Sequence, residues 1–365
     1  MGSIDINQNH PAVQVDIPII DISGYLAGDP DAKRKAAAEF RQACENQGFL
    51  QVVGHSVPEA IQQRFLAGIA SFFALPLSQK EKVSQTKSKC HRGYERVGGQ
   101  KLDELDDSAT PDQKEGFSVR RDRPLGRFLQ GPNQWPEPEP ESKPETETEE
   151  TKAEAELSKI PTATKVFDHV QFQESYMAYF DAVHDLSKAV FRLLALSLDL
   201  SEDHFDAFAA DPDGLCLCRA HHYPPTPVDA AGRTRGVGAH TDFGALTLLL
   251  QDEVGGLEVL HKPTGTWHNV PPIKGAYVCN IGDLMQIWTN NRYKSTMHRV
   301  ISPLSGKDRY SCAFFNDGAL DTVVECLPTC RVPGQRPVYE PLKVEAHLVQ
   351  RYLQSYGAAG TVLVS

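Results

Sequence analysis

Short apolar runs separated by turn residues fill the second half of the chain, and this pattern limits the fold more than any other feature. Turns are marked by Gly255-Gly256, Pro263-Thr264-Gly265 and Gly306-Lys307-Asp308. The runs cover residues 215–222, 245–250, 256–260, 276–281, 295–301 and 310–315. Many short strands at this spacing predict a sandwich or a closed barrel, and a double-stranded β-helix (jelly roll) fits them.

Helical patterns flank this β-rich region. The expected elements are strands at 17–22 and 49–53, a helix from Pro30 to the turn at Gly48, and helices at 58–74, 164–198 and 341–356. Asp29 can cap the first helix, because its carboxylate accepts hydrogen bonds from free N–H groups of the first turn. The predicted fold class is therefore mainly β with flanking helices: a jelly-roll core, an N-terminal α/β region and a long support helix.

An acidic segment interrupts the pattern of strands and helices, and its position defines the expected division of the chain into regions. Nine Glu and two Lys lie between Glu137 and Glu156, a balance of −7 that leaves −4 of the total −11 for the rest of the chain. Alternating Pro and Glu cannot bury apolar surface, so a solvated insert is expected here. The division is 1–135 for the N-terminal region, 136–160 for a disordered insert, 161–330 for the jelly-roll core with its support helix, and 331–365 for a C-terminal helix, all within one catalytic unit.

Net charge, apolar run length and cysteine content limit the kinds of partner and cellular setting that are expected. A net charge of −11 argues against a nucleic-acid or anionic-membrane surface. No apolar run approaches the ~20 residues that span a bilayer, and the start of the chain lacks the apolar core of a signal peptide. The eight cysteines are thinly scattered, which favours reduced thiols. A cytoplasmic monomer is the expectation.

A His-x-Asp pair followed by a distant histidine carries the chemistry. His240 and Asp242 stand at i and i+2, so on a strand their side chains point the same way. His298 can complete three ligands on one face of a metal. Two imidazoles and one carboxylate with open positions are the facial triad of non-haem Fe(II) oxygenases. A catalytic zinc site uses similar ligands, so a zinc-dependent hydrolase stays an alternative, although no His-Glu-x-x-His motif lies nearby.

A second pair suggests how an acid would be held. Arg309 and Ser311 again stand at i and i+2, so guanidinium and hydroxyl share one face. Arg offers a planar fork of donors that matches a carboxylate, and Ser adds one hydrogen bond. A metal triad beside this pair suggests a 2-oxo acid such as 2-oxoglutarate, chelated by Fe(II) at its keto end and anchored by Arg309 and Ser311 at the other.

The chain resembles the isopenicillin N synthase-like family of Fe(II)/2-oxoglutarate-dependent dioxygenases. Matching stretches stand in family order over residues 17–316: IPIIDISGYL, QGFLQVVGHSVP, HHYPPTP, GAHTDFGALTLLLQDEVGGLEV, VCNIGDLMQIWTNNRYKSTMHRV and RYSCAFFN. HTDFG, KSTMHRV and RYS are the most specific of them. The resemblance places the iron ligands at His240, Asp242 and His298, and the 2-oxoglutarate contacts at Arg309, Ser311 and Tyr223. His221 stands where plant members often have Asn.

The resemblance also implies a reaction. The expected enzyme oxidises an unactivated C–H bond of a small specialised metabolite, by hydroxylation, desaturation or ring formation, and releases succinate and CO2. It would require Fe(II), 2-oxoglutarate as co-substrate and O2, with ascorbate as a supporting reductant. Phe243, Phe315 and Tyr94 are expected to line the substrate pocket.

Other activities remain open at this point. One is an oxidase of the isopenicillin N synthase type, in which Arg309 and Ser311 would grip the substrate's own carboxylate. Another is an ethylene-forming enzyme that consumes 2-oxoglutarate as its substrate. A metal-bearing binding module without turnover is a third, because a fold does not guarantee an activity.

Overall fold

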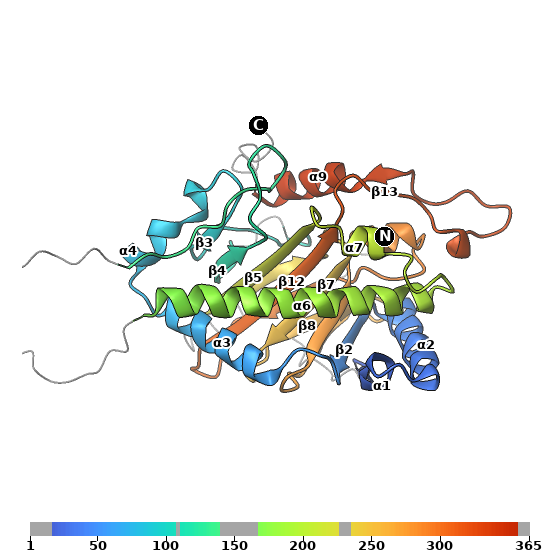
Figure 1. Cartoon of the computed structure of the whole chain (residues 1–365), viewed down its shortest axis with the longest axis horizontal. Coiled ribbons are helices and arrows are strands. Elements are labelled where there is room, and N and C mark those ends of the chain that lie inside the picture. Colours follow the sequence, from blue (N-terminus) through green and yellow to red (C-terminus); the bar gives the residue numbers. More distant parts are fainter. Residues whose placement is uncertain (1–16, 107–109, 139–166, 226–234, 357–365) are drawn as a thin grey trace, which may run out of the picture.

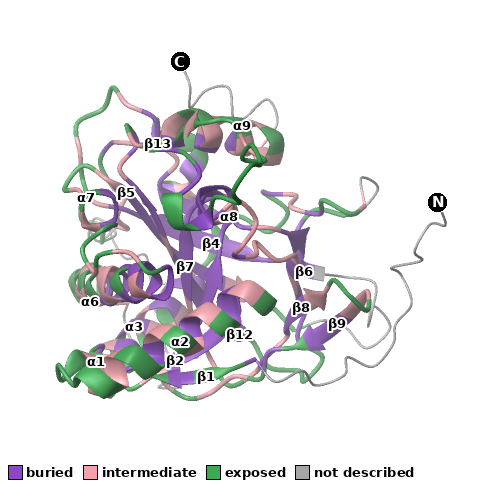
Figure 2. Cartoon of the chain, turned by 90° about the vertical axis from the view of Figure 1, so that its right-hand side faces the viewer, coloured by how far each residue is buried: buried purple, intermediate pink, exposed green. Residues whose placement is uncertain are grey.

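The computed structural model describes residues 17–106, 110–138, 167–225 and 235–356. Most of the segment expected to be a disordered insert (136–160) lies outside these ranges. In the described part, two β-sheets form the centre and helices cover one side (Figures 1 and 2).

The larger sheet has the strand order β1-β2-β10-β7-β12-β5-β4-β3, and the smaller has the order β6-β11-β8-β9. All these pairings are antiparallel except that of β1 with β2. The larger sheet comprises β1 (Ile19–Asp21), β2 (Phe49–Val53), β3 (Gly93–Glu95), β4 (Glu115–Val119), β5 (Leu215–Tyr223), β7 (Leu246–Gln251), β10 (Tyr277–Ile281) and β12 (Arg309–Gly318). The smaller comprises β6 (Arg235–His240), β8 (Leu257–His261), β9 (Thr266–Asn269) and β11 (His298–Ile301). Together they form the expected jelly roll.

The period-two alternation of β12 shows why the core takes this shape. Its even residues face the helices, where Phe314 meets Phe180 at 5.2 Å between ring centroids and Asn316 donates a hydrogen bond to Ser187. Its odd residues, including Ala313 and Phe315, line the space between the two sheets. Figure 2 shows this buried layer between the helices and the smaller sheet.

The long support helix α6 (His169–Ser197) crosses the helical side of the larger sheet (Figure 1). Its start differs from the prediction of Thr164, because the Asp168 carboxylate caps it by accepting from the Gln171 N–H at 2.8 Å. Tyr176 fixes the helix to the sheet. Its hydroxyl bonds to the carbonyls of Phe117 (2.7 Å) and Cys218 (3.1 Å), and it accepts from the Ala220 N–H (3.2 Å).

The N-terminal helices agree closely with the sequence pattern. The helix α2 (Pro30–Asn46) begins after Asp29, whose side chain accepts from two first-turn N–H groups. The helix α3 (Glu59–Phe73) packs on α6, with Phe65 stacked on Tyr179 at 3.9 Å between ring centroids. The shorter helical pieces are α1 (Ser23–Leu26), α4 (Leu77–Lys80), α7 (Asp206–Ala209), α8 (Asp283–Trp288) and the 3-10 turns Glu81–Val83, Gln85–Lys87 and Pro328–Cys330.

Other predicted boundaries also differ from the structure. The helix expected at 341–356 is α9 (Val344–Tyr356), because the two preceding residues form β14 (Leu342–Lys343) and pair with β13 (Val323–Val324). The strand expected from 295 begins at His298, because Ser295 and Thr296 instead bond to Asp283 and the Gln47 carbonyl. The last predicted strand, 310–315, extends over 309–318.

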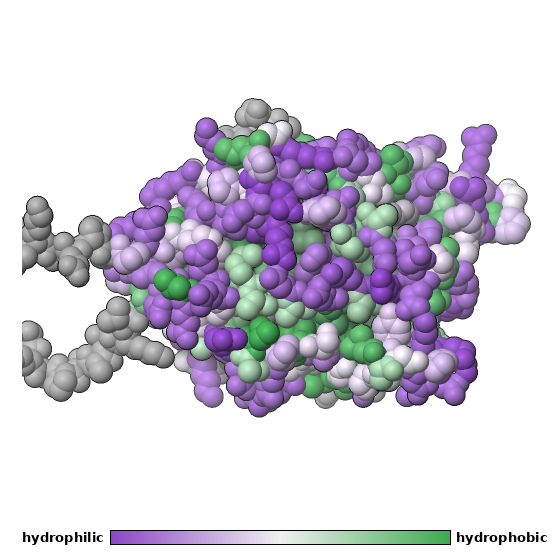
Figure 3. Space-filling view, in the orientation of Figure 1, coloured by the Kyte–Doolittle hydropathy of each residue, from purple (hydrophilic) through white to green (hydrophobic). Residues whose placement is uncertain are grey.

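The surface is mostly hydrophilic on the face seen in Figure 3, with apolar side chains showing between polar ones in its middle. All eight cysteines are buried and free. Within the described ranges, no single helix has both the length and the apolar character needed to cross a bilayer, although the bent pair Glu59–Phe73 and Leu77–Val83 meets these criteria jointly.

The contact between α6 and the sheet leads to a prediction for stability. Tyr176→Phe removes the hydroxyl that serves two strands and leaves buried backbone groups without a partner, so the free energy of unfolding should fall by about 1–3 kcal/mol. Tyr310→Phe is the matched control, since this hydroxyl has no hydrogen bond to any described residue; its effect should stay within about 0.5 kcal/mol. Urea unfolding measures both, and equal effects would show that the Tyr176 hydroxyl does not stabilise the contact.

Candidate active site

Three potential metal ligands converge where β6 and β11 pair. His240 ends β6 and stands directly opposite His298 at the start of β11, with 4.3 Å between ring centroids. Asp242 follows two residues after His240. Its Oδ1 lies 3.8 Å from His240 Nε2 and 3.6 Å from His298 Nε2. One donor atom from each residue lies within 4.8 Å of the others, and all three residues are buried.

Backbone carbonyls fix the direction of both imidazoles. The Nδ1 of His240 bonds to the Gly238 carbonyl at 2.8 Å, and the Nδ1 of His298 bonds to the Thr296 carbonyl at 3.0 Å. Because a carbonyl oxygen only accepts, each Nδ1 carries the proton and each Nε2 presents a lone pair to the centre of the triad. Burial lowers the pKa of both histidines, which favours the neutral form that binds a metal.

The Asp242 carboxylate is held in the same way. Its Oδ2 accepts hydrogen bonds from Thr247 Oγ1 and Asn280 Nδ2, both at 2.6 Å, which leaves Oδ1 free for a metal. Burial opposes ionisation of this carboxyl, but the facing His298 and His240, together with the two hydrogen bonds, hold its pKa below the ordinary value. Two neutral nitrogens and one carboxylate oxygen on one side of an open space fit Fe(II) in a facial arrangement.

A buried guanidinium forms a second feature between the same two sheets. Arg309 is fully buried, and its side chain donates to Ser311 Oγ at 3.2 Å and to Gln251 Oε1 at 3.1 Å. The Tyr223 ring lies beneath it, 4.7 Å from the guanidinium carbon. No carboxylate of the described chain pairs with Arg309, and its Nε has no hydrogen-bond partner there. A buried cation without an acid is available for an anionic ligand.

The strand register explains this grouping. Arg309 pairs with Tyr223 of β5, and Ser311 lies between His221 of β5 and Gln251 of β7. The three residues predicted to contact the co-substrate (Arg309, Ser311 and Tyr223) therefore do lie together.

Two adjoining hollows meet at the triad. The inner hollow is lined by Tyr223, His221 and the triad. The outer hollow is bounded by aromatic side chains, including the predicted Phe243 and Phe315. His221 is buried, and its Nε2 has no partner in the described chain, so it faces the inner hollow with an unused nitrogen.

The prediction that Tyr94 lines the substrate pocket was wrong. Tyr94 lies on β3 and borders neither hollow at the triad. Its hydroxyl donates to Glu115 at 2.5 Å, and its ring lies 6.2 Å from that of Phe72. Tyr94 is thus a core residue whose hydroxyl satisfies a buried carboxylate.

Several residues of the site escaped the sequence reasoning. Thr247 and Asn280, which hold Asp242, had no local signal because they come from β7 and β10. Arg219 of β5 and Asp317 of β12 share the inward face with residues that were predicted, so the i, i+2 alternation could have found them. Burial raises the pKa of the Asp317 carboxyl to about 7. Tyr352 and Tyr356 of α9 also line the outer hollow.

Comparison with known proteins agrees with this geometry. Residues 17–138 match a family model described as the N-terminal region of non-haem dioxygenases in morphine synthesis. Residues 214–318 match the 2OG-Fe(II) oxygenase superfamily.

Similarity also extends over almost the whole chain. The 2-oxoglutarate-Fe(II) type oxidoreductase hxnY of Emericella nidulans is 41% identical over 350 residues, which are 94% of this chain and 91% of hxnY. The 2-oxoglutarate-dependent dioxygenase citB of Monascus ruber is 38% identical over 93% of this chain and 95% of citB. Among solved structures, a full-length Neurospora crassa protein in complex with alpha-KG (2-oxoglutarate) and thymine has a TM-score of 0.75 and 29% identity, and the match covers 92% of this chain and 96% of the Neurospora crassa chain.

The chain therefore belongs to the 2OG-Fe(II) oxygenase superfamily. It is an Fe(II)- and 2-oxoglutarate-dependent oxygenase on a jelly-roll fold, and the predicted family, fold and enzyme class are confirmed.

The hydrogen bonds to Asp242 lead to a second prediction. Thr247→Val keeps the shape of the side chain but removes one of two donors to Oδ2, so the carboxylate is less firmly oriented. The affinity for Fe(II) should fall about 10- to 100-fold, the usual effect of losing a group that orients a metal ligand. Anaerobic Fe(II) titration measures this, with Thr247→Ser as the control that keeps the hydroxyl. Equal affinities in the two variants would contradict the role of the Thr247 hydroxyl.

Proposed function

We propose that His240, Asp242 and His298 bind Fe(II), and that Arg309 with Ser311 binds the distal carboxylate of 2-oxoglutarate. One observation carries this proposal: a fully buried guanidinium without an acid partner in the described chain lies between the same two sheets as the triad. Such a charge is costly to bury unless a ligand pairs with it. A zinc-dependent hydrolase offers no partner for Arg309, so the oxygenase accounts for more of the site.

Each side chain then has a defined task. The two Nε2 atoms and Asp242 Oδ1 are the atoms aimed at the metal position. The Arg309 guanidinium neutralises a carboxylate, and the hydroxyls of Ser311 and Tyr223 adjoin it. Buried apolar residues of both sheets, including Phe49 and Val300, exclude water from the inner hollow. When bound, Fe(II) and 2-oxoglutarate supply the oxidising chemistry, in which O2 is consumed and succinate and CO2 are released.

We further propose that the substrate is a small specialised metabolite and that an unactivated C–H bond is oxidised, by hydroxylation, desaturation or ring formation. The outer hollow supports this, since aromatic walls that carry several polar groups suit a small organic molecule. The relatives hxnY and citB are fungal enzymes of the same co-substrate class, and the Neurospora crassa structure holds the small molecule thymine. The four-part domain division, the monomeric state and the cytoplasmic location stay predictions, which limited proteolysis, light scattering and cell fractionation test.

The iron centre has a direct test. Anaerobic titration of the Fe(II)-loaded protein with 2-oxoglutarate should produce the weak visible charge-transfer band of a chelated 2-oxo acid. His240→Ala and Asp242→Ala should lose the band and succinate formation together, because two remaining ligands hold a divalent ion poorly. His204→Ala, which replaces an exposed histidine, is the control. Full activity in either triad variant, or hydrolysis supported by Zn(II) alone, would reject the proposal.

The co-substrate anchor has a separate test. Arg309→Ala should raise the 2-oxoglutarate concentration needed for half-maximal succinate formation about 10- to 150-fold, since a charge-assisted hydrogen bond contributes about 1.5–3 kcal/mol. Arg336→Ala, at an exposed arginine, should leave this requirement unchanged. If Arg309→Ala also left it unchanged, the site would be that of an oxidase in which Arg309 grips the substrate instead.

A further inference from the structure

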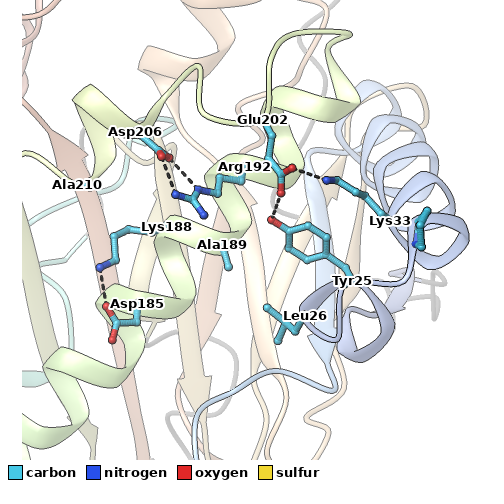
Figure 4. A pocket seen from close by; sticks show the side chains of 12 residues that line it. Tyr25, Leu26, Lys33, Asp185, Lys188, Ala189, Arg192, Glu202, Asp206 and Ala210 are labelled. Carbon is cyan, nitrogen blue, oxygen red and sulfur yellow. Dashed lines mark hydrogen bonds and ion pairs between the residues drawn. The ribbon is translucent and has the colours of Figure 1, made fainter.

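A separate hollow, away from the triad, lies between α1 and α6 (Figure 4). Every charged side chain that lines it has a partner. The contacts are Tyr25 and Lys33 with Glu202, Arg192 with Asp206, and Lys188 with Asp185. Because these charges are already satisfied, this hollow points to no ligand.

Arg219 beside the triad is different. One of its terminal nitrogens donates to Glu95, but its Nε is buried without a partner in the described chain. Glu95 is shared, because Lys114 bonds to the same carboxylate oxygen at 2.9 Å. Asp112 acts on Lys114 through space and accepts from the Gly238 N–H. Two buried cations thus contact one carboxylate, and Arg219 keeps donor capacity for a further acceptor.

The position of Arg219 directs its remaining hydrogen-bond donors toward the outer hollow. Arg219 borders both the inner and the outer hollow, together with His240, Asp242 and Phe315. Arg309, which lies against the Tyr223 ring at the edge of the inner hollow, is already assigned to the co-substrate. Arg219 is paired with Glu95, and the donor capacity that this ion pair leaves unused is available to the molecule that occupies the outer hollow.

Asp317 is the complementary group, and it lines the outer hollow further along the same face of the larger sheet. It is 5% exposed and forms no hydrogen bond or ion pair with any described residue. Gly244 makes room for it, since a Cβ at that position would lie 1.7 Å from Asp317 Oδ1. Arg219 stands opposite Ala313 on β12, four residues before Asp317, so the two α-carbons are roughly 14 Å apart along the strand. Phe315 lies between them on the same face.

We propose that the outer hollow binds a small cyclic acid, whose carboxylate pairs with Arg219 and whose hydrogen-bond-donating substituent meets Asp317. The ring of this acid lies against the aromatic walls provided by Phe243, Phe315 and Tyr352. Arginine suits a carboxylate because its planar fork matches both oxygens, and an acceptor further along the same face orients the ring toward the triad. This inference rests on the proposed function, because it assigns the substrate of the same iron site.

The wild-type enzyme provides the first test. Three probes are titrated by calorimetry into the anaerobic complex with Fe(II) and 2-oxoglutarate: 3-hydroxybenzoate with both groups, 3-hydroxybenzamide without the charge, and benzoate without the donor. The carboxylate contact should make 3-hydroxybenzoate bind at least about 10-fold more tightly than 3-hydroxybenzamide. Benzoate should bind more weakly than 3-hydroxybenzoate by a smaller factor.

Substitutions at the two positions separate the contribution of Arg219 to probe binding from that of Asp317. Arg219→Gln should remove the preference for acid over amide, and Arg219→Lys should retain part of it. Asp317→Ala should remove the preference for 3-hydroxybenzoate over benzoate and leave the preference for acid over amide intact. Both variants should keep the 2-oxoglutarate charge-transfer band, because Arg309, Ser311 and the triad are the groups proposed to hold the co-substrate.

Several results would overturn the inference. These are equal binding of acid and amide to the wild type, no binding of any probe, or an Arg219→Gln variant that loses affinity for 2-oxoglutarate while its probe binding is unchanged. In each case a normal charge-transfer band in the wild type would leave the proposed function standing. Loss of that band in the wild type would instead reject the proposed function itself.

Discussion

The antiparallel register of β6 and β11 is the constraint on which the rest of the site depends. It places His240 directly across from His298, so two ligands that are distant in the sequence become neighbours. A slip of one residue would turn one imidazole to the other face of the sheet and destroy the triad. The close turn after β6 then brings Asp242 back toward both rings. The metal position is therefore a consequence of strand pairing, and the flanking helices act on it only by holding the sheets together.

Buried polar groups that await a ligand characterise the space between the sheets. Buried charges elsewhere bond to protein atoms, as Lys80 does to Glu115 and Arg92 does to backbone carbonyls. Between the sheets, Arg309 has no acid and Asp242 shows one free oxygen to the centre. These groups reduce the stability of the free protein, and ligands that satisfy them bind the folded state alone. Stability and occupancy of the site should therefore rise together.

The sequence predicted the site residues that follow a local spacing along a strand. It did not predict the features that depend on contacts between distant segments. The triad and the Arg309–Ser311 pair could be predicted because i, i+2 spacing on a strand places side chains on one face. The boundaries of β11 and α9 could not, because they depend on contacts with distant segments. Tyr94 was misassigned for a related reason. The sequence does not distinguish a tyrosine that lines a pocket from one that bonds to a buried carboxylate, and only the folded structure places Glu115 beside Tyr94. The partners of Asp242 come from two other strands, so only the folded sheet reveals them.

The C-terminal helix α9 has an evolutionary consequence. It contributes Tyr352 to the wall of the outer hollow, yet it lies beyond residue 318, where the match to the oxygenase superfamily model ends. The strands that carry the triad and Arg309 lie inside that match. Part of the outer hollow is thus encoded outside the stretch that carries the oxidative chemistry, although Arg219, Phe315 and Asp317 lie inside it. A lineage can exchange the residues of α9 and acquire a new metabolite while the iron centre stays untouched, which gives such enzymes an economical route to diversification.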